Sequence, residues 1–162
     1  INVIGTSMVK GIEPYKMKGS LNNNDKLFVK SFSGATVRDL VDYSIPSRRH
    51  SPQVYILQGG GNDLSDKTKN TETIANELID LAKDLKTPEN DVLIGGIMAR
   101  KDRFNEKGKT LDNVLKAKCS ELNIGFIDNS NINCSHINNS LVHLTSYGSR
   151  ILAGNYLRAI NI

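Results

Sequence analysis

The sequence predicts an α/β protein, a three-layer α/β/α sandwich around a five-stranded parallel sheet. Short apolar runs rich in β-branched residues alternate with longer segments of helical period. Runs that are apolar throughout are typical of strands covered on both faces. Alternating strands and helices favour right-handed crossovers between parallel strands. The chain has 162 residues, a length that fits one domain over residues 1–162.

The predicted elements follow one another along the whole chain. The strands span residues 1–4, 27–32, 54–57, 92–97 and 124–127. Helical spacing joins apolar residues within 74–85, 111–122 and 151–157. Thr36 and Asp39 have the spacing of a capping box, and Thr145 or Ser146 can cap the last helix. We predict the flavodoxin-like strand order 2-1-3-4-5, with a switch point between the first and third strands.

The composition excludes several classes of protein. Apolar residues make up 38% of the chain and charged residues 23%, which supports a buried core rather than general disorder. The formal net charge is +4, too mild to indicate a dedicated surface for nucleic acid or anionic lipid. No apolar run approaches the roughly 20 residues that span a bilayer. Ile1 opens directly into a strand pattern, which argues against a signal peptide and indicates a piece of a longer protein.

The two cysteines are far apart and form no Cys-x-x-Cys pattern. This arrangement indicates neither a disulfide framework nor a zinc cage, and it favours an intracellular location, cytoplasmic or nuclear. Cys119 shares a helical face with Leu111 and Leu115, which predicts a buried thiol. His136 lies two residues from Cys134, but further metal ligands are missing from this segment, so we predict no metal site.

Function is sought at the carboxyl ends of the strands, where ligands of open parallel sheets bind. Ser7 follows the first strand in Gly5-Thr6-Ser7, a turn that presents a hydroxyl at the sheet edge. Its backbone N–H would lie at the start of a helix, where developing negative charge is favoured. Taken alone, a Gly-x-Ser turn is more often a plain helix N-cap than the site of a nucleophile.

A run of three glycines, 59–61, follows the third strand and precedes Asn62 and Asp63. Glycine permits positive φ and close approach of a ligand, and the Asn62 amide can donate into the same crevice. The alternative is a glycine-rich turn with Asn62 and Asp63 as caps. The run lacks the spacing of a phosphate-binding loop.

His143 lies just before the last helix and can face the crevice, although an isolated histidine is usually structural. His50 follows two arginines and precedes Pro52, a pattern typical of a solvated loop.

Together these blocks resemble the SGNH, or GDSL-like, hydrolase superfamily over nearly the whole chain. The nucleophile block of that family matches residues 5–7, its lone glycine matches Gly34, and its Gly-x-Asn-Asp block matches residues 60–63. Its Asp-x-x-His block falls on residues 140–143. More narrowly, residues 33–40, 59–64 and 126–148 resemble the esterase-like domains of some non-LTR retrotransposon proteins.

The resemblance implies an acyl-ester hydrolase without metal or organic cofactor. Ser7 would be the nucleophile and His143 the base, and the oxyanion hole would comprise the Ser7 and Gly34 N–H groups and the Asn62 amide. The implied substrate is a small acyl ester or a lipid. Two residues depart from the family pattern: Thr6 replaces the aspartate of Gly-Asp-Ser, and Ser140 replaces the aspartate that orients the histidine. Ser140 could orient His143 in its place, and Asp128 is another acid that could substitute.

A degenerate module that keeps this fold and binds lipid, nucleic acid or a protein without turnover is the alternative. Its motivation is the two departures and a set of basic residues, namely Arg48, Arg49, Arg100, Lys101 and Arg103. A solvated rim explains the same charges. Nucleic acid would be a partner chiefly through flanking regions of a longer protein.

Overall fold

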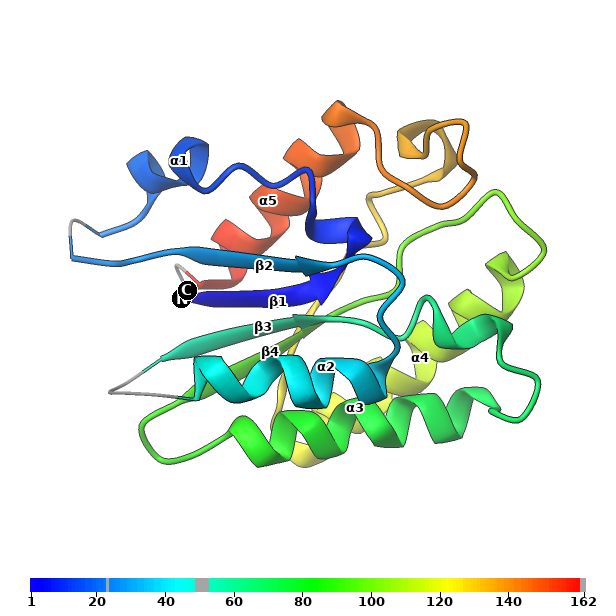
Figure 1. The fold of residues 1–162 in the computed structure, drawn as a ribbon, viewed down its shortest axis with the longest axis horizontal. Helices are drawn as coiled ribbons and strands as arrows, with labels where there is room; N and C mark the ends of the chain where they lie inside the picture. The colour runs from blue at the N-terminus through cyan, green and yellow to red at the C-terminus, as the bar shows by residue number, and fades with distance from the viewer. Residues whose placement is uncertain (23, 49–52, 161–162) are drawn as a thin grey trace.

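A five-stranded parallel sheet forms the centre of the molecule (Figure 1). The computed structural model describes residues 1–22, 24–48 and 53–160. The strands are β1 (Asn2–Thr6), β2 (Phe28–Phe32), β3 (Val54–Gln58), β4 (Asp91–Gly95) and β5 (Gly125–Ile127). Their order is β2-β1-β3-β4-β5, and all neighbours pair in parallel. Both the five strands and the predicted order are confirmed, with strand ends shifted by one or two residues.

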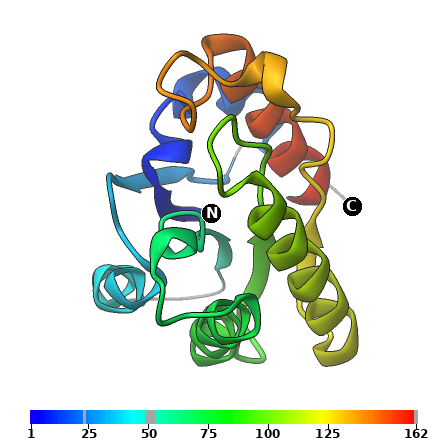
Figure 2. The ribbon, with the colours of Figure 1, turned by 90° about the vertical axis from the view of Figure 1, so that its right-hand side faces the viewer.

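Helices cover both faces of the sheet. They are α1 (Pro14–Met17), α2 (Val37–Ser44), α3 (Thr71–Leu85), α4 (Asn105–Leu122) and α5 (Ser146–Ile160). Five short 3₁₀ turns accompany them, η1 (Ser7–Val9), η2 (Lys18–Ser20), η3 (Ile45–Ser47), η4 (Asp63–Ser65) and η5 (Cys134–His136). Figures 1 and 2 show α2, α3 and α4 on one face and α1 and α5 on the other, so the predicted three layers are present.

The core lies in two clusters, one on each side of the sheet. Successive residues of a strand point to opposite faces. Ile4 therefore joins the cluster beneath α2, α3 and α4, whereas Val3 joins the cluster beneath α5. Leu111 and Tyr156 are fully buried in these two clusters, respectively.

The edge strand β2 departs from the expectation that every strand is covered on both faces. Phe28 is 51% exposed, and the rest of β2 is only partly buried. A strand at the edge of the sheet has a neighbour on one side only, and here the covering helices leave it partly open. Apolar character along the chain could not show this, because it depends on the strand order.

Local capping fixes where the helices begin. Thr36 and Asp39 form the predicted capping box at the start of α2, each side chain bonded to the backbone of the other. The Thr145 hydroxyl accepts a hydrogen bond from Gly148 N–H at 3.0 Å at the start of α5. These caps satisfy helix N–H groups that have no partner within the helix.

The predicted burial of Cys119 is confirmed, and burial raises the pKa of its thiol to about 11. Across the described part of the chain, no helix combines the length and the apolar character needed to cross a bilayer.

Candidate active site

Ser7 directly follows β1, at the carboxyl end of that strand, where the sequence predicted it. The helix expected there is only the three-residue turn η1, so a long helix dipole does not act on Ser7. Thr6, where the resembled family has aspartate, is 4% exposed and accepts a weak 3.5 Å hydrogen bond from Met8 N–H. Its carbonyl accepts the Ser31 hydroxyl at 3.1 Å, which ties the turn to β2.

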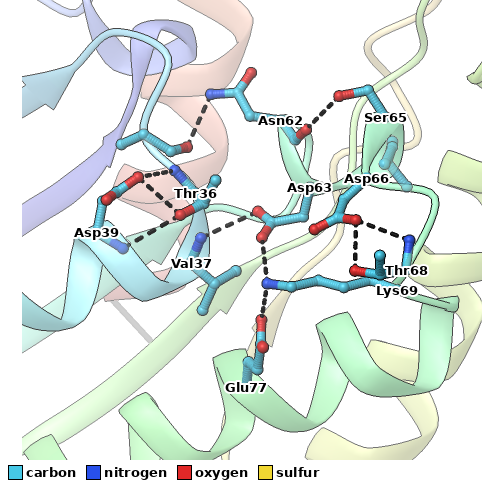
Figure 3. Close-up of polar contacts among 12 residues, drawn as sticks. Thr36, Val37, Asp39, Asn62, Asp63, Ser65, Asp66, Thr68, Lys69 and Glu77 are labelled. Carbon is cyan, nitrogen blue, oxygen red and sulfur yellow. Dashed lines mark hydrogen bonds and ion pairs between the residues drawn. The ribbon is translucent and has the colours of Figure 1, made fainter.

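Gly34 and Asn62 lie on neighbouring loops after β2 and β3. Gly34 has φ +77°, a conformation that favours glycine, and its N–H donates to no acceptor within residues 1–22, 24–48 and 53–160. The Asn62 amide donates to the Ala35 carbonyl at 2.8 Å (Figure 3). Since an amide nitrogen carries two hydrogens, one donor of Asn62 remains for a ligand.

Asp63 fixes the glycine-rich loop to two helices. Its fully buried carboxylate accepts Val37 N–H at 3.0 Å at the start of α2 and the Lys69 ammonium at 3.1 Å (Figure 3). Lys69 also pairs with Glu77 of α3 at 2.6 Å. Burial alone would lower the pKa of Lys69, but the hydrogen bonds to Glu77 and Asp63 raise it. Asp63 therefore acts as an anchor of the loop that carries Asn62.

Two cavities meet at Ser7 on this edge of the sheet. The smaller, about 30 Å³, is lined by Ser7, Asn62, Arg100 and other residues of the loops after β3 and β4. The larger, about 320 Å³, is lined by Ser7, His143 and several polar side chains. Figure 2 faces this edge and shows the loop after β4 and the orange segment near α5 gathered above the end of β1. Ser7 thus lines one cavity together with Asn62 and the other together with His143.

His143 lies on an exposed turn that is held by its own backbone. Its N–H donates to the Ser140 hydroxyl at 3.0 Å, and its carbonyl accepts Asn138 N–H at 2.8 Å. Among the described residues, the imidazole makes no hydrogen bond to Ser7 or to Ser140. Ser140 therefore contacts the histidine through the main chain in this structure, and Gly34 and Ser140 line neither cavity.

Comparison with known proteins identifies the fold of this chain from solved structures, whereas sequence comparison finds no relative. No protein-family model matches the chain, and no curated protein sequence matches it significantly. Among solved structures, a GDSL-like lipase from Bacteroides thetaiotaomicron superposes with a TM-score of 0.81 at 16% identity, covering 99% of this chain and 86% of that one. An acetylxylan esterase from Geobacillus stearothermophilus gives 0.77 at 18% identity, covering 99% and 93%. A lipolytic G-D-S-L family protein from Veillonella parvula gives 0.78 at 18%, covering 99% and 97%.

This chain has the fold of GDSL-like hydrolases. Asp128, the other acid considered as support for the histidine, lines neither of the two cavities. Asp128 is exposed and accepts Ser130 N–H at 2.8 Å and the Lys116 ammonium at 3.3 Å. The hydrogen bonds with Ser130, and to a smaller extent the contact with Lys116, lower the pKa of Asp128. No three His, Cys, Asp or Glu side chains in the described ranges are grouped to hold a metal ion.

The basic residues of this set that the structure describes lie on two separate segments of the chain. Arg48, just after η3, pairs with Asp84 of α3, whereas Arg100, Lys101 and Arg103 are on the loop after β4. The Lys101 ammonium donates to the Ile137 carbonyl at 2.6 Å. Arg49 and His50 lie outside the described residues.

Arg100 is the cavity residue that sequence reasoning placed only among the surface charges. Its guanidinium donates to the Gly61 carbonyl at 2.9 Å and to both oxygens of Asp102. The side chain is 15% exposed, and its hydrogen bond to Asp102 lowers the pKa of that carboxyl. Nothing in the local sequence links Arg100 to Gly61, which is 39 residues away.

A buried amide network beneath the cavities was also missed. Gln58 closes β3, donates to the Gly95 and Gly96 carbonyls and accepts the Tyr156 hydroxyl at 2.8 Å. A Cβ at Gly95 would stand 2.0 Å from the Gln58 side chain, so only glycine leaves room for it. Asn129 joins the network and accepts from Asn155 at 2.8 Å. The polar Gln58 at the end of an apolar strand was the available signal.

Proposed function

We propose that the protein hydrolyses carboxylic esters with Ser7 as nucleophile and His143 as general base. The observation that carries the proposal is the position of Ser7 between two cavities, one shared with Asn62 and the other with His143. A lipase and an acetylxylan esterase with this fold give further support. The resemblance to retrotransposon esterase-like domains belongs to this proposal as well, because it rests on motifs of the sequence alone.

The proposed reaction has two stages, acylation of Ser7 and hydrolysis of the acyl-enzyme. His143 accepts the Ser7 proton as the hydroxyl oxygen attacks the ester carbonyl, and N–H groups of Ser7, Gly34 and Asn62 stabilise the oxyanion. His143 then returns the proton to the departing alcohol, and an acyl group remains on Ser7. Water, activated by His143, releases the carboxylic acid and restores the serine. The hydrogen bond between His143 and Ser7 would form when substrate closes the site.

We expect slow turnover, because a neutral serine replaces the acid that supports the histidine. In serine proteases, replacing that acid by its amide costs about 10⁴ in rate. An uncharged acceptor or water would orient the imidazole here. A module of this fold that binds lipid, nucleic acid or a protein without turnover is the second candidate, and it is favoured by the lack of a hydrogen bond to the imidazole within the described residues.

The test is hydrolysis of p-nitrophenyl acetate together with fluorophosphonate labelling of Ser7 followed by intact mass. We expect the wild type to react in both assays and Ser7→Ala in neither. Ser120→Ala, on the exposed surface of α4, is the matched control and should behave as wild type. A folded wild type that forms no adduct and releases no nitrophenol would refute the proposal and favour the binding module.

A further inference from the structure

The two cavities that meet at Ser7 differ about tenfold in volume, and we infer a substrate preference from this difference. The smaller holds about 30 Å³ and the larger about 320 Å³. A cavity needs about 10–15 Å³ on this measure to hold one water. The smaller therefore has room for two or three groups of about the size of a water molecule.

The chemistry of the proposed function assigns a role to each cavity. The departing alcohol must lie against the group that protonates it, which is His143, so it occupies the larger cavity. The acyl group is then left on the side of Asn62, in the smaller cavity. The larger cavity also presents Lys10, Ser33 and Asn138, which can bond an alcohol that carries further polar groups.

Arg100 forms a rigid wall of the smaller cavity. Asp102 holds the guanidinium through two hydrogen bonds, and the Gly61 carbonyl holds a third N–H at 2.9 Å. The backbone of Arg100 is fixed as well, because its N–H donates to the Asn105 side chain at 2.9 Å. Bidentate pairing restricts the geometry of an arginine more than a single contact would. The wall therefore cannot swing aside without breaking an ion pair.

We propose that Arg100, held by Asp102, limits the acyl group of the substrate to about two carbons and that the enzyme acts on short-chain esters of larger polar alcohols. The proposal rests on the proposed function. It makes Arg100 a specificity-determining residue, although it takes no part in proton transfer. The guanidinium would also oppose burial of a longer apolar chain, since its two remaining N–H donors would lose water.

The experiment compares kcat/KM for p-nitrophenyl acetate, butyrate and hexanoate, which share one leaving group. We expect butyrate to be slower than acetate by about 10-fold or more, since one methylene in a fitted pocket changes kcat/KM by about 10- to 200-fold. Arg100→Ala should bring butyrate to within about threefold of acetate, and Asp102→Asn should shift the ratio part of the way without removing the arginine.

Arg103→Ala is the matched control, because this neighbouring arginine stacks on Phe104 at 4.9 Å and does not line the cavity. It should keep the wild-type ratio. Thermal melting shows whether each variant is folded. If Arg100→Ala does not fold, Asp102→Asn still tests the role of the arginine. Equal rates for all three esters in the wild type, or an unchanged ratio in both folded variants, would overturn this inference while the proposed function stands. Failure of Ser7 to react with any ester or fluorophosphonate would overturn both.

Discussion

The two sides of Ser7 hold their polar residues in different ways. On one side, Asp63 is fully buried and binds α2 and Lys69, so the loop with Asn62 is fixed by the core of the molecule. On the other side, His143 lies on an exposed turn whose hydrogen bonds run mainly among residues 138–143. The core of the fold thus fixes Asn62, the residue proposed to stabilise an oxyanion. A surface turn positions His143, the residue proposed to move the proton.

The loop that carries Asn62 and the turn that carries His143 are expected to tolerate substitutions differently. Replacing a residue of the Asn62 side disturbs buried charges and two helices, whereas replacing a residue of the His143 turn leaves the core intact. Sequence changes that weaken catalysis without unfolding the protein are therefore expected first in the turn. Position 140, where this chain has serine and the resembled family pattern has aspartate, lies in that turn.

The largest expected effect is the loss of stability in Asp63→Ala. This variant removes the acceptor of Val37 N–H and one of the two carboxylates that bind Lys69. Breaking a buried pair costs about 3–5 kcal/mol, and we expect the lower end because Glu77 still binds Lys69. Urea denaturation measures this free energy of unfolding.

Asp66→Ala on the same loop is the control for that prediction. Asp66 is only partly buried and bonds locally to Thr68 at 2.8 Å (Figure 3). We expect a much smaller loss of stability than in Asp63→Ala, because the Asp66 carboxylate bonds only within its own turn. If the two variants lost the same stability, Asp63 would not be the anchor of the loop.

An intermediate effect is expected from Ser140→Asp, which places a carboxylate on the His143 turn. The charge would stabilise the imidazolium formed during attack, so the rate on activated esters should rise about tenfold. The low-pH limb of kcat/KM should also move to higher pH, because a nearby negative charge favours the protonated imidazole.

Ser140→Asn separates charge from shape in this test. Asparagine offers a similar side chain with an oxygen acceptor but without the negative charge. It should therefore leave the low-pH limb where the wild type has it. An aspartate variant with an unchanged rate and an unmoved limb would mean that position 140 does not act on His143.

The same contrast explains what the sequence could predict. The strands, their order and the capping box of Thr36 follow from local apolar runs and short-range hydrogen bonds, and all were predicted. The contacts of Arg100 with Gly61 and of Gln58 with Tyr156 join residues 39 and 98 positions apart. Such contacts depend on the folded arrangement, and no local pattern marks them. The helix expected after β1 is only the three-residue turn η1.

The smallest expected effect concerns Leu141, which adopts φ +71° at the centre of the His143 turn. The left-handed conformation costs a non-glycine residue about 1–2 kcal/mol, and glycine costs about 0.5–1 kcal/mol of extra backbone entropy. Leu141 is 46% exposed, so little packing is lost on its removal. Leu141→Gly should therefore stabilise the protein by about 0.5 kcal/mol in thermal denaturation. Leu141→Ala keeps the strain and should not stabilise it; an equal gain in both would show that the exposed side chain, rather than the backbone of the turn, carries the cost.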